Sequence, residues 1–437
     1  MTGRQRAPTG LPRLLSAIPA EGTMSLREHV AAHGEPPLAH SRRERREAAA
    51  LIDEIEHAGL LGRGGAAFPT AIKMRAVARA RGQPVVVVNG AEGEPASLKD
   101  RTLLTAVPHL VLDGALLAAQ AIGAEKIIVC ALESDEGSLK SLARALDERP
   151  QLGASPPAIR LVTVPDRYVA GQESALVNHL NGGPATPTFT PPLPIERGVG
   201  HRPTLVNNTE TLAHIALIAR HGPKWFRQLG TTAQPGSTLI TLSGPVAYPG
   251  VYEIEHGASL ASLIDAAGGN TTAVRAGLFG GYAGAWISGE RLGDITLSNE
   301  QLAPHRASLG AGVILLLSED ACPVAETARV ARWLADQSAG QCGPCVHGLD
   351  AIATTIEDVA DGAAQSEAKH RIVRLASLTR RRGACNHPDG TVRFILTALE
   401  VFGAEFADHA QHGPCDACQR EGELPLPDRT RPIAAPV

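Results

Sequence analysis

The sequence predicts an α/β fold in which a domain built on a parallel sheet precedes a small β-rich module and a C-terminal helical bundle. Three observations predict it. Short apolar runs rich in valine and isoleucine alternate with helical patterns over residues 46–236, which is typical of a parallel, layered sheet. Strand patterns interrupted by glycine occupy residues 237–320, and apolar residues recur at helical spacing over residues 321–405.

Length and composition exclude several classes of protein. The chain has 437 residues, enough for two to four domains, and its 43% apolar content supports a globular core. It has no run of about 18 uncharged apolar residues, so we expect no direct membrane insertion. Residues 1–20 lack a continuous apolar segment, and the net charge of −4 gives no reason to expect nucleic acid. We therefore expect a cytoplasmic protein.

The first domain is predicted to contain three buried strands separated by helices. Before it, residues 1–45 mix proline, glycine, arginine and serine without periodicity, which predicts a poorly ordered arm. The predicted strands are the β-branched runs 84–89, 126–132 and 159–164, and the predicted helices cover 43–59, 71–80, 110–123 and 139–148.

A glycine-rich loop precedes the helix at 71–80. Glycines keep side chains away from a ligand, and successive free N–H groups can bind an anion. Arg63 and Lys73 add positive charge at the two ends, so the loop is predicted to bind a phosphate. A tight turn at the start of a helix is the alternative interpretation. The candidate ligand-binding residues of this loop are Gly62, Arg63, Gly64, Gly65, Phe68 and Lys73.

Polar residues follow the predicted strand 84–89. Open α/β sheets bind ligands at the carboxyl ends of their strands. Asn89 can both donate and accept hydrogen bonds there, and the carboxylates of Glu92 and Glu94 can accept them from ribityl or ribose hydroxyls. A solvated acidic turn would have the same composition.

Two later polar segments also precede predicted helices. Glycine permits close backbone approach to a ligand, and polar side chains near a helix start can bind one. Asparagines in such positions also cap helices, and capping is the simpler interpretation for any one of them. The candidates are Tyr168, Gly171, Gln172 and Glu173 in the first segment, and Val206, Asn207 and Asn208 in the second.

Three cysteines of the bundle form a candidate metal site. Cys342 and Cys345 are spaced to bind one site, and Cys385 returns from a distant loop. Such sets are common in iron–sulfur and zinc ligation. The pattern favours a cluster, while His347 and His387 leave zinc open.

The tail contains a second C-x-x-C pair, Cys415 and Cys418. This pair could donate a ligand to the bundle site, bind its own metal, or act as a redox pair. Cys322 precedes the bundle, and Cys130 lies in an apolar strand, where it is expected to be a small core residue.

The order of these motifs resembles the family of flavin-binding (51 kDa) subunits of NADH:quinone oxidoreductase (complex I), across roughly residues 45–405. The module after residue 237 resembles the family's SLBB domain, a β-grasp-like fold. The motifs are Gly62 to Lys73, Asn89 to Pro95 with Lys99-Asp100-Arg101, Tyr168 to Leu176, Pro203 to Leu212, and Gln337 to Gly348.

This resemblance implies an oxidoreductase that passes electrons from NAD(P)H through FMN to a [4Fe–4S] cluster on the bundle. It implies FMN in the glycine loop, with Lys73 near the phosphate, and NAD(H) as the substrate. It also places Glu94 and Glu173 toward the nicotinamide nucleotide. Around the ribityl chain and flavin ring it places Asn89, Glu92, Gly171, Asn207 and Asn208.

The sequence departs from the family at three points. Ala339 replaces the first cluster cysteine, so we expect Cys415 or Cys418 to supply the missing ligand. Ala91 makes its motif closer to the flavin-domain subunit of the Rnf complex. Leu193 replaces an aromatic residue that stacks on the nicotinamide nucleotide, which weakens the expectation of NADH more than that of FMN.

Three functions therefore compete. The first is the oxidoreductase, which requires a protein electron acceptor such as a ferredoxin-like or membrane redox subunit. The second is an adaptor that binds FMN or a cluster and does not oxidise NADH. The third is a zinc-stabilised scaffold without flavin. In the first two, a partner would attach the protein peripherally to the inner face of the membrane.

Overall fold

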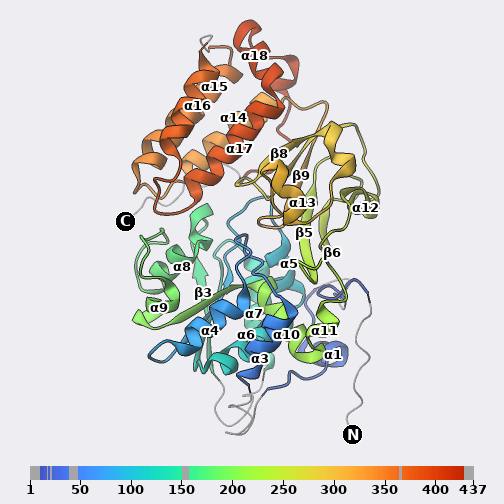
Figure 1. The fold of residues 1–437 in the computed structure, drawn as a ribbon, viewed down its shortest axis with the longest axis vertical. Coiled ribbons are helices and arrows are strands. Elements are labelled where there is room, and N and C mark those ends of the chain that lie inside the picture. The colour runs from blue at the N-terminus through green and yellow to red at the C-terminus, as the bar shows by residue number, and fades with distance from the viewer. Residues whose placement is uncertain are drawn as a thin grey trace.

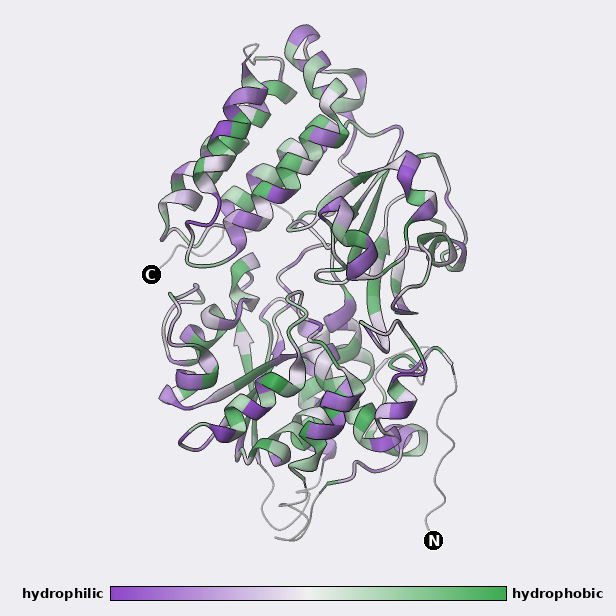
Figure 2. Cartoon of the chain, viewed as in Figure 1, coloured by the Kyte–Doolittle hydropathy of each residue, from purple (hydrophilic) through white to green (hydrophobic). Residues whose placement is uncertain are grey.

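The computed structural model describes residues 10–16, 18–19, 22–38, 48–149, 157–363 and 367–427. Figure 1 shows helices around a parallel sheet at the bottom, a second sheet at the upper right and a group of C-terminal helices at the top. The predicted α/β fold class is confirmed. Figure 2 shows mainly hydrophobic strands in the second sheet and alternating hydrophobic and hydrophilic bands along the C-terminal helices.

The first sheet has four parallel strands in the order β3-β2-β1-β4. Its central strand β1 is valine-rich and its first four residues are buried, as expected for a strand covered on both faces. β4 was not predicted as a strand, because its short apolar run ends in two asparagines. The strands are β1 (Val85–Gly90), β2 (Lys126–Leu132), β3 (Ala158–Val164) and β4 (Thr204–Asn208).

Helices cover this sheet, and among them α6 and α10 pack against each other. α6 is apolar along almost its whole length and buried. Gly114 allows this contact, because a Cβ atom there would lie 1.8 Å from the carbonyl oxygen of Leu212 on α10. The helices are α3 (Ala50–Ala58), α4 (Thr70–Arg79), α5 (Lys99–Ala106), α6 (Pro108–Ile122), α7 (Glu136–Glu148), α8 (Glu173–Leu180), α9 (Pro194–Arg197), α10 (Thr209–His221) and α11 (Pro223–Phe226).

Part of the segment predicted as a poorly ordered arm is structured. α1 (Leu26–His33) begins with a capping box between Ser25 and Glu28, which satisfies free N–H groups of its first turn. His29 of this helix contacts the buried carboxylate of Asp113 at 2.7 Å. The prediction is therefore wrong for α1, while residues 1–9 and 39–45 lie outside the described part of the chain.

The second sheet has five strands in the order β6-β5-β9-β7-β8. β5 and β9 are parallel, and the other pairs are antiparallel. α12 (Leu260–Ala266) packs its Leu260 and Leu263 into the core of this module. The strands are β5 (Ser237–Ser243), β6 (Gly250–Glu255), β7 (Val274–Phe279), β8 (Ala285–Ser288) and β9 (Val313–Ser318), and a short helix, α13, spans Asn299–Leu302.

The C-terminal region is helical, as predicted, and the helix over Gly403–His412 extends beyond the predicted bound at residue 405. No single helix in the described residues has both the length and the apolar composition to cross a bilayer; only α5 and α6 together, bent by 96°, meet that test. The helices are α14 (Pro323–Asp336), α15 (Asp350–Ala360), α16 (Ala368–Thr379), α17 (His387–Val401) and α18 (Gly403–His412).

Gly114→Ala tests whether the contact between α6 and α10 limits stability. The added methyl group meets backbone of α10 that cannot move without separating the helices, so we expect the free energy of unfolding to fall by about 3 kcal/mol. Gly137→Ala on α7 is the control: its Cβ would meet nothing closer than 3.7 Å, so stability should hold or rise by less than about 1 kcal/mol. Denaturant unfolding measures both, and equal midpoints would contradict the argument.

Candidate functional site

The glycine loop lies over the carboxyl end of β4. Its two ends are joined by the hydrogen bond from the Gly62 N–H to the Phe68 carbonyl, at 2.9 Å. Gly65 has a φ of +102°, a conformation that other residues rarely adopt. A Cβ atom on Gly64 would contact the side chain of Asn208 at 3.4 Å. The loop backbone therefore lies next to the last residue of β4, at the carboxyl edge of the sheet.

Lys73 connects three elements at this edge. Its ammonium group donates to the carbonyl of Val206 on β4 at 2.9 Å and lies 3.0 Å from the Glu173 carboxylate on α8. Its side chain is partly buried, so the charge is held in one position. Phe68, in the same loop, is half exposed. The structure thus places a fixed positive charge and an exposed ring next to the loop backbone.

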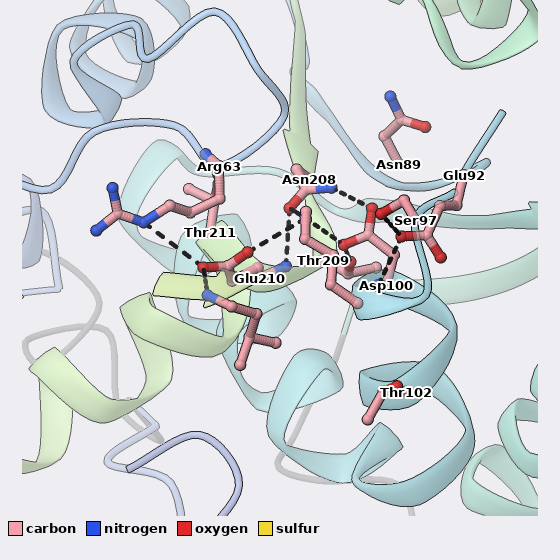
Figure 3. Close-up of polar contacts among 12 residues, drawn as sticks. Arg63, Asn89, Glu92, Ser97, Asp100, Thr102, Asn208, Thr209, Glu210 and Thr211 are labelled. Atoms are coloured by element: carbon pink, nitrogen blue, oxygen red, sulfur yellow. Dashed lines mark hydrogen bonds and ion pairs between the residues drawn. The ribbon is translucent and has the colours of Figure 1, made fainter. Parts of the chain in front are cut away.

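The side chain of Arg63 does not belong to this site, contrary to the prediction. Its guanidinium is buried, donates to the carbonyl of Ser237 at 3.0 Å and lies 3.7 Å from Glu210 (Figure 3). It therefore points toward β5 and contacts the second sheet. Only the backbone of Arg63 remains available to a ligand in the loop.

Glu92 has a structural role that the sequence did not indicate. Its carboxylate accepts hydrogen bonds from the N–H groups of Asp100 and Arg101 at 3.0 Å each, and from the Ser97 hydroxyl at 2.5 Å. These N–H groups belong to the first turn of α5, where the helix itself offers no carbonyl to accept their hydrogen bonds. Glu92 therefore stabilises the start of α5, and the expected contact with the ribityl chain has no support from its position.

A buried group of charges lies next to the side chain of Arg63 (Figure 3). The ammonium of Lys99 is 2.7 Å from Asp100 and 3.2 Å from Glu210, and Asp100 accepts from Asn208 at 2.6 Å and from Thr209 at 2.5 Å. Burial alone would lower the pKa of Lys99, but the two carboxylates raise it. These residues stay ionised because they are paired. The role of Glu210 is not evident from its position in the sequence.

Two of the predicted ligand-binding residues are helix caps. The Gln172 side chain accepts from the Ala175 N–H at 2.9 Å, and that of Asn208 accepts from the Glu210 N–H at 3.0 Å. The simpler interpretation of Asn208 as a cap is therefore correct.

Asn89 donates to the Gly171 carbonyl at 2.8 Å, and this contact ties the end of β1 to the segment before α8.

Asn207 differs from its neighbour because its side-chain nitrogen is buried without a hydrogen-bond partner in the described residues. Leaving a buried amide unsatisfied costs about 1–3 kcal/mol, so this group fits a site that a ligand completes. Together with the loop and Lys73, it makes the carboxyl edge of the sheet suitable for a phosphorylated flavin.

Glu94 lies where the two sheets meet. Its carboxylate accepts from the N–H of Tyr282 at 2.9 Å and from the N–H of Ala96 at 3.5 Å, and a Cβ atom on Gly281 would come within 2.5 Å of it. Burial raises the pKa of Glu94 to about 7. The predicted nucleotide-facing carboxylate is therefore an internal contact between the β1 loop and the turn between β7 and β8.

The bundle cysteines gather in one pocket. Cys342, Cys345 and Cys385 line it together with Ala339 and His387. His387 donates from Nε2 to the carbonyl of Leu334 at 2.8 Å, and its Nδ1 is buried without a partner among the described residues. Three thiols and one free imidazole nitrogen fit a cluster site that lacks a fourth cysteine.

The tail cysteines do not reach this pocket, contrary to the prediction. α18 directs the chain toward the start of α14, where Cys415 and Cys418 lie with Cys322 and His409. The ligand atoms of these four residues are all within 4.8 Å of one another. His409 was not a candidate in the sequence; its position six residues before Cys415 is the only signal that could have found it. Cys130 is fully buried in β2, as predicted.

The raised pKa of Glu94 predicts a pH dependence. Between its ordinary pKa of about 4.5 and about 7, the folded state keeps a proton that the unfolded state has lost. The free energy of unfolding should therefore fall as the pH rises through this window. Glu94→Gln has no carboxyl proton to lose, so its free energy of unfolding should not fall with this titration. Between pH 5 and pH 8, the difference in unfolding free energy between the variant and the native chain should therefore shift in favour of the variant by on the order of 2 kcal/mol. Glu300→Gln, at an exposed site, is the control. If the free energy of unfolding depended on pH in the same way in both variants, the prediction would be contradicted.

Three family models match the chain in the order of its three regions. They are the Nuo51 FMN-binding domain over residues 55–217, the SLBB domain over 239–280, and the NADH-ubiquinone oxidoreductase-F iron-sulfur binding region over 325–409. The predicted classes of cofactor, FMN and a [4Fe–4S] cluster, agree with these matches.

Named relatives cover most of the chain. The F subunit of the NADH-quinone oxidoreductase from Streptomyces coelicolor is 31% identical over 377 residues, 84% of each chain. The corresponding F 2 subunit from Rhizobium meliloti is 30% identical, covering 84% of this chain and 90% of the relative. The crystal structure of an NAD+-reducing [NiFe]-hydrogenase in the H2-reduced state superimposes on this chain with a TM-score of 0.79 and 32% sequence identity. The match covers 84% of this chain and 64% of the hydrogenase chain, so this chain spans less than two thirds of that one. The protein belongs to the family of flavin-binding F subunits of NADH-quinone oxidoreductases.

Proposed function

We propose that the chain is the subunit of an oxidoreductase that oxidises NAD(P)H with FMN and passes electrons through a [4Fe–4S] cluster to a partner protein. The observation that carries the proposal is the position of one short turn, η1 (Tyr168–Gly171). Gly171 accepts the hydrogen bond of Asn89 at the edge of the parallel sheet, and Val169 lines the cysteine pocket. The candidate flavin and cluster sites therefore adjoin each other.

The residues that would hold FMN are those of the sheet edge. The N–H groups of the glycine loop and the ammonium of Lys73 would bind the phosphate, and the free amide of Asn207 would donate to the flavin. When bound, FMN accepts a hydride and releases electrons singly, a conversion that belongs to the cofactor and not to side chains. The protein contributes position, charge and exclusion of water.

The residues that would hold the cluster are Cys342, Cys345 and Cys385, with His387 Nδ1 as the fourth ligand. The bond from Nε2–H to the Leu334 carbonyl leaves the lone pair of Nδ1 free. The ring of Tyr168 packs against His387 with centroids 5.4 Å apart. The backbone N–H of the same residue donates to the Gln337 side chain at 2.9 Å, just before the cysteine motif, so η1 is fastened to the cluster side.

An adaptor that does not oxidise NADH is the second candidate function. It is favoured by Leu193, which is partly exposed where the family has an aromatic residue, and by Glu94, whose carboxylate is already occupied. In both functions we infer a cytoplasmic protein whose electrons go to a redox partner, with peripheral attachment to a membrane through that partner. Two C-x-x-C pairs suited to metal ligation support this location, because thiols stay reduced in the cytoplasm.

The first test is the absorption spectrum of the anaerobically purified chain before and after NADH. We expect flavin bands and a broad iron–sulfur shoulder, both bleached by NADH. Cys342→Ser should lose the shoulder and keep the flavin bands, whereas Cys130→Ala should keep both. Flavin bands unaffected by NADH would favour the adaptor, and a shoulder that survives in Cys342→Ser would refute the cluster assignment.

Lys73→Ala tests the phosphate contact. A charge-assisted hydrogen bond contributes about 1.5–3 kcal/mol, so the dissociation constant of FMN should rise by roughly 10- to 100-fold. Riboflavin lacks the phosphate, so its affinity should be almost unchanged. Quenching of flavin fluorescence by the reconstituted chain measures both, with Arg79→Ala, at an exposed position on the last turn of α4, as the control. Equal losses for FMN and riboflavin would assign Lys73 a structural role.

A further inference from the structure

A second group of metal-binding side chains lies where the tail meets the start of α14. Cys322 is the N-cap of α14, His409 belongs to α18, and Cys415 and Cys418 lie at the start and within the short turn η6 (Asp416–Gln419) of the tail. Cys322 and His409 are buried, and the tail cysteines are partly buried. The iron–sulfur family model begins at residue 325 and ends at 409, so three of the four side chains lie outside it.

The distances within this group match one tetrahedral ion. His409 Nε2 is 3.4 Å from the sulfur of Cys322 and 3.2 Å from that of Cys418, which is 3.3 Å from Cys322 and 3.7 Å from Cys415. Zinc bonds of about 2.3 Å to sulfur and 2.0–2.1 Å to nitrogen place tetrahedral ligands about 3.5–3.8 Å apart. A cluster gives each cysteine its own iron atom and needs wider spacing.

The histidine is oriented to bind a metal. Its Nδ1–H donates to the carbonyl of Glu405 at 2.8 Å, which leaves the lone pair of Nε2 directed at the sulfurs. The N–H of Cys415 donates a long hydrogen bond to this lone pair at 3.5 Å, and a bound metal would take its place. A backbone carbonyl that fixes the tautomer in this way is the usual outer contact of a zinc-bound histidine. The N–H of Ala325 donates to the Cys322 sulfur at 3.4 Å, which stabilises a thiolate.

We propose that Cys322, His409, Cys415 and Cys418 bind a structural zinc ion. Four protein ligands fill the tetrahedral shell and leave no position for a substrate, so the ion has no catalytic role. Zinc is favoured over iron because one imidazole and three thiolates gather around a single point. Binding displaces the protons of the three thiols and therefore tightens as the pH rises.

The ion fastens the tail to the rest of the molecule. Beyond the site, the N–H groups of Glu423 and Leu424 donate to the Glu326 carboxylate on α14 at 2.8 and 3.1 Å. The carbonyl of Pro425 accepts from the hydroxyl of Tyr282 at 2.6 Å, and the N–H of Tyr282 donates to Glu94. The tail thus reaches the residue that joins the two sheets, and the zinc site holds the start of this connection.

Metal analysis of the full-length chain tests the proposal without using activity. We expect about one zinc per chain in addition to cluster iron. Cys418→Ser should lose the zinc and keep the iron, Cys342→Ser should lose the iron and keep the zinc, and Cys130→Ala should keep both. Zinc retained in Cys418→Ser, iron in place of zinc, or a disulfide among the three cysteines on mass spectrometry would each overturn the proposal.

A second measurement needs no variant. The chain expressed with cobalt(II) in place of zinc should show the ligand-field bands of a tetrahedral thiolate site. Removing the metal with a chelator should speed hydrogen exchange in residues 413–427 and leave β1 unchanged. Absent cobalt bands, or exchange that does not change, would overturn the proposal. Because the readouts are zinc content and tail exchange, they are independent of flavin binding and NADH oxidation.

Discussion

The interaction on which the rest of the structure depends is the buried ion pair between Lys99 and Glu210. Glu210 also accepts hydrogen bonds from the Thr238 hydroxyl and the Leu239 N–H of β5, at 2.9 and 3.0 Å. A buried charge is tolerated only when it is fully paired, so α5, α10 and β5 must meet in one arrangement. This arrangement fixes the parallel sheet against the second sheet and presents the glycine loop, through Arg63, at the edge of β4.

The same network explains which polar residues remain for a ligand. Asn208, Asp100 and Glu92 are occupied by one another or by helix N–H groups, and they stabilise the framework of the site. Lys73 pairs with Glu173 instead, and the Asn207 amide is a buried donor without a partner among the described residues. Family motifs therefore mix two kinds of residue, those that build the site and those that contact its ligand.

The sequence predicted what depends on local pattern. The valine-rich run of β1 and the apolar strand β2 could be found because buried parallel strands need such runs, and the glycine loop could be found from its lack of side chains. β4 was missed because its last residues are polar, and the N-terminal helix was missed although Ser25 and Glu28 have capping-box spacing. The roles of Glu92 and Glu210 depend on partners in other elements, which spacing along the chain does not encode.

The two C-x-x-C pairs illustrate this limit most directly. Each pair gives two thiols at the same separation along the chain, so the spacing cannot distinguish their third and fourth ligands. The fold makes the distinction: Cys342 and Cys345 precede α15 and face the loop of Cys385, whereas α18 carries His409 and the tail pair to the N-cap of α14. Ala339 suggested that the tail must complete the first site. With His387 Nδ1 as the proposed fourth ligand, the first site does not need the tail, and the tail pair lies with Cys322 and His409 instead.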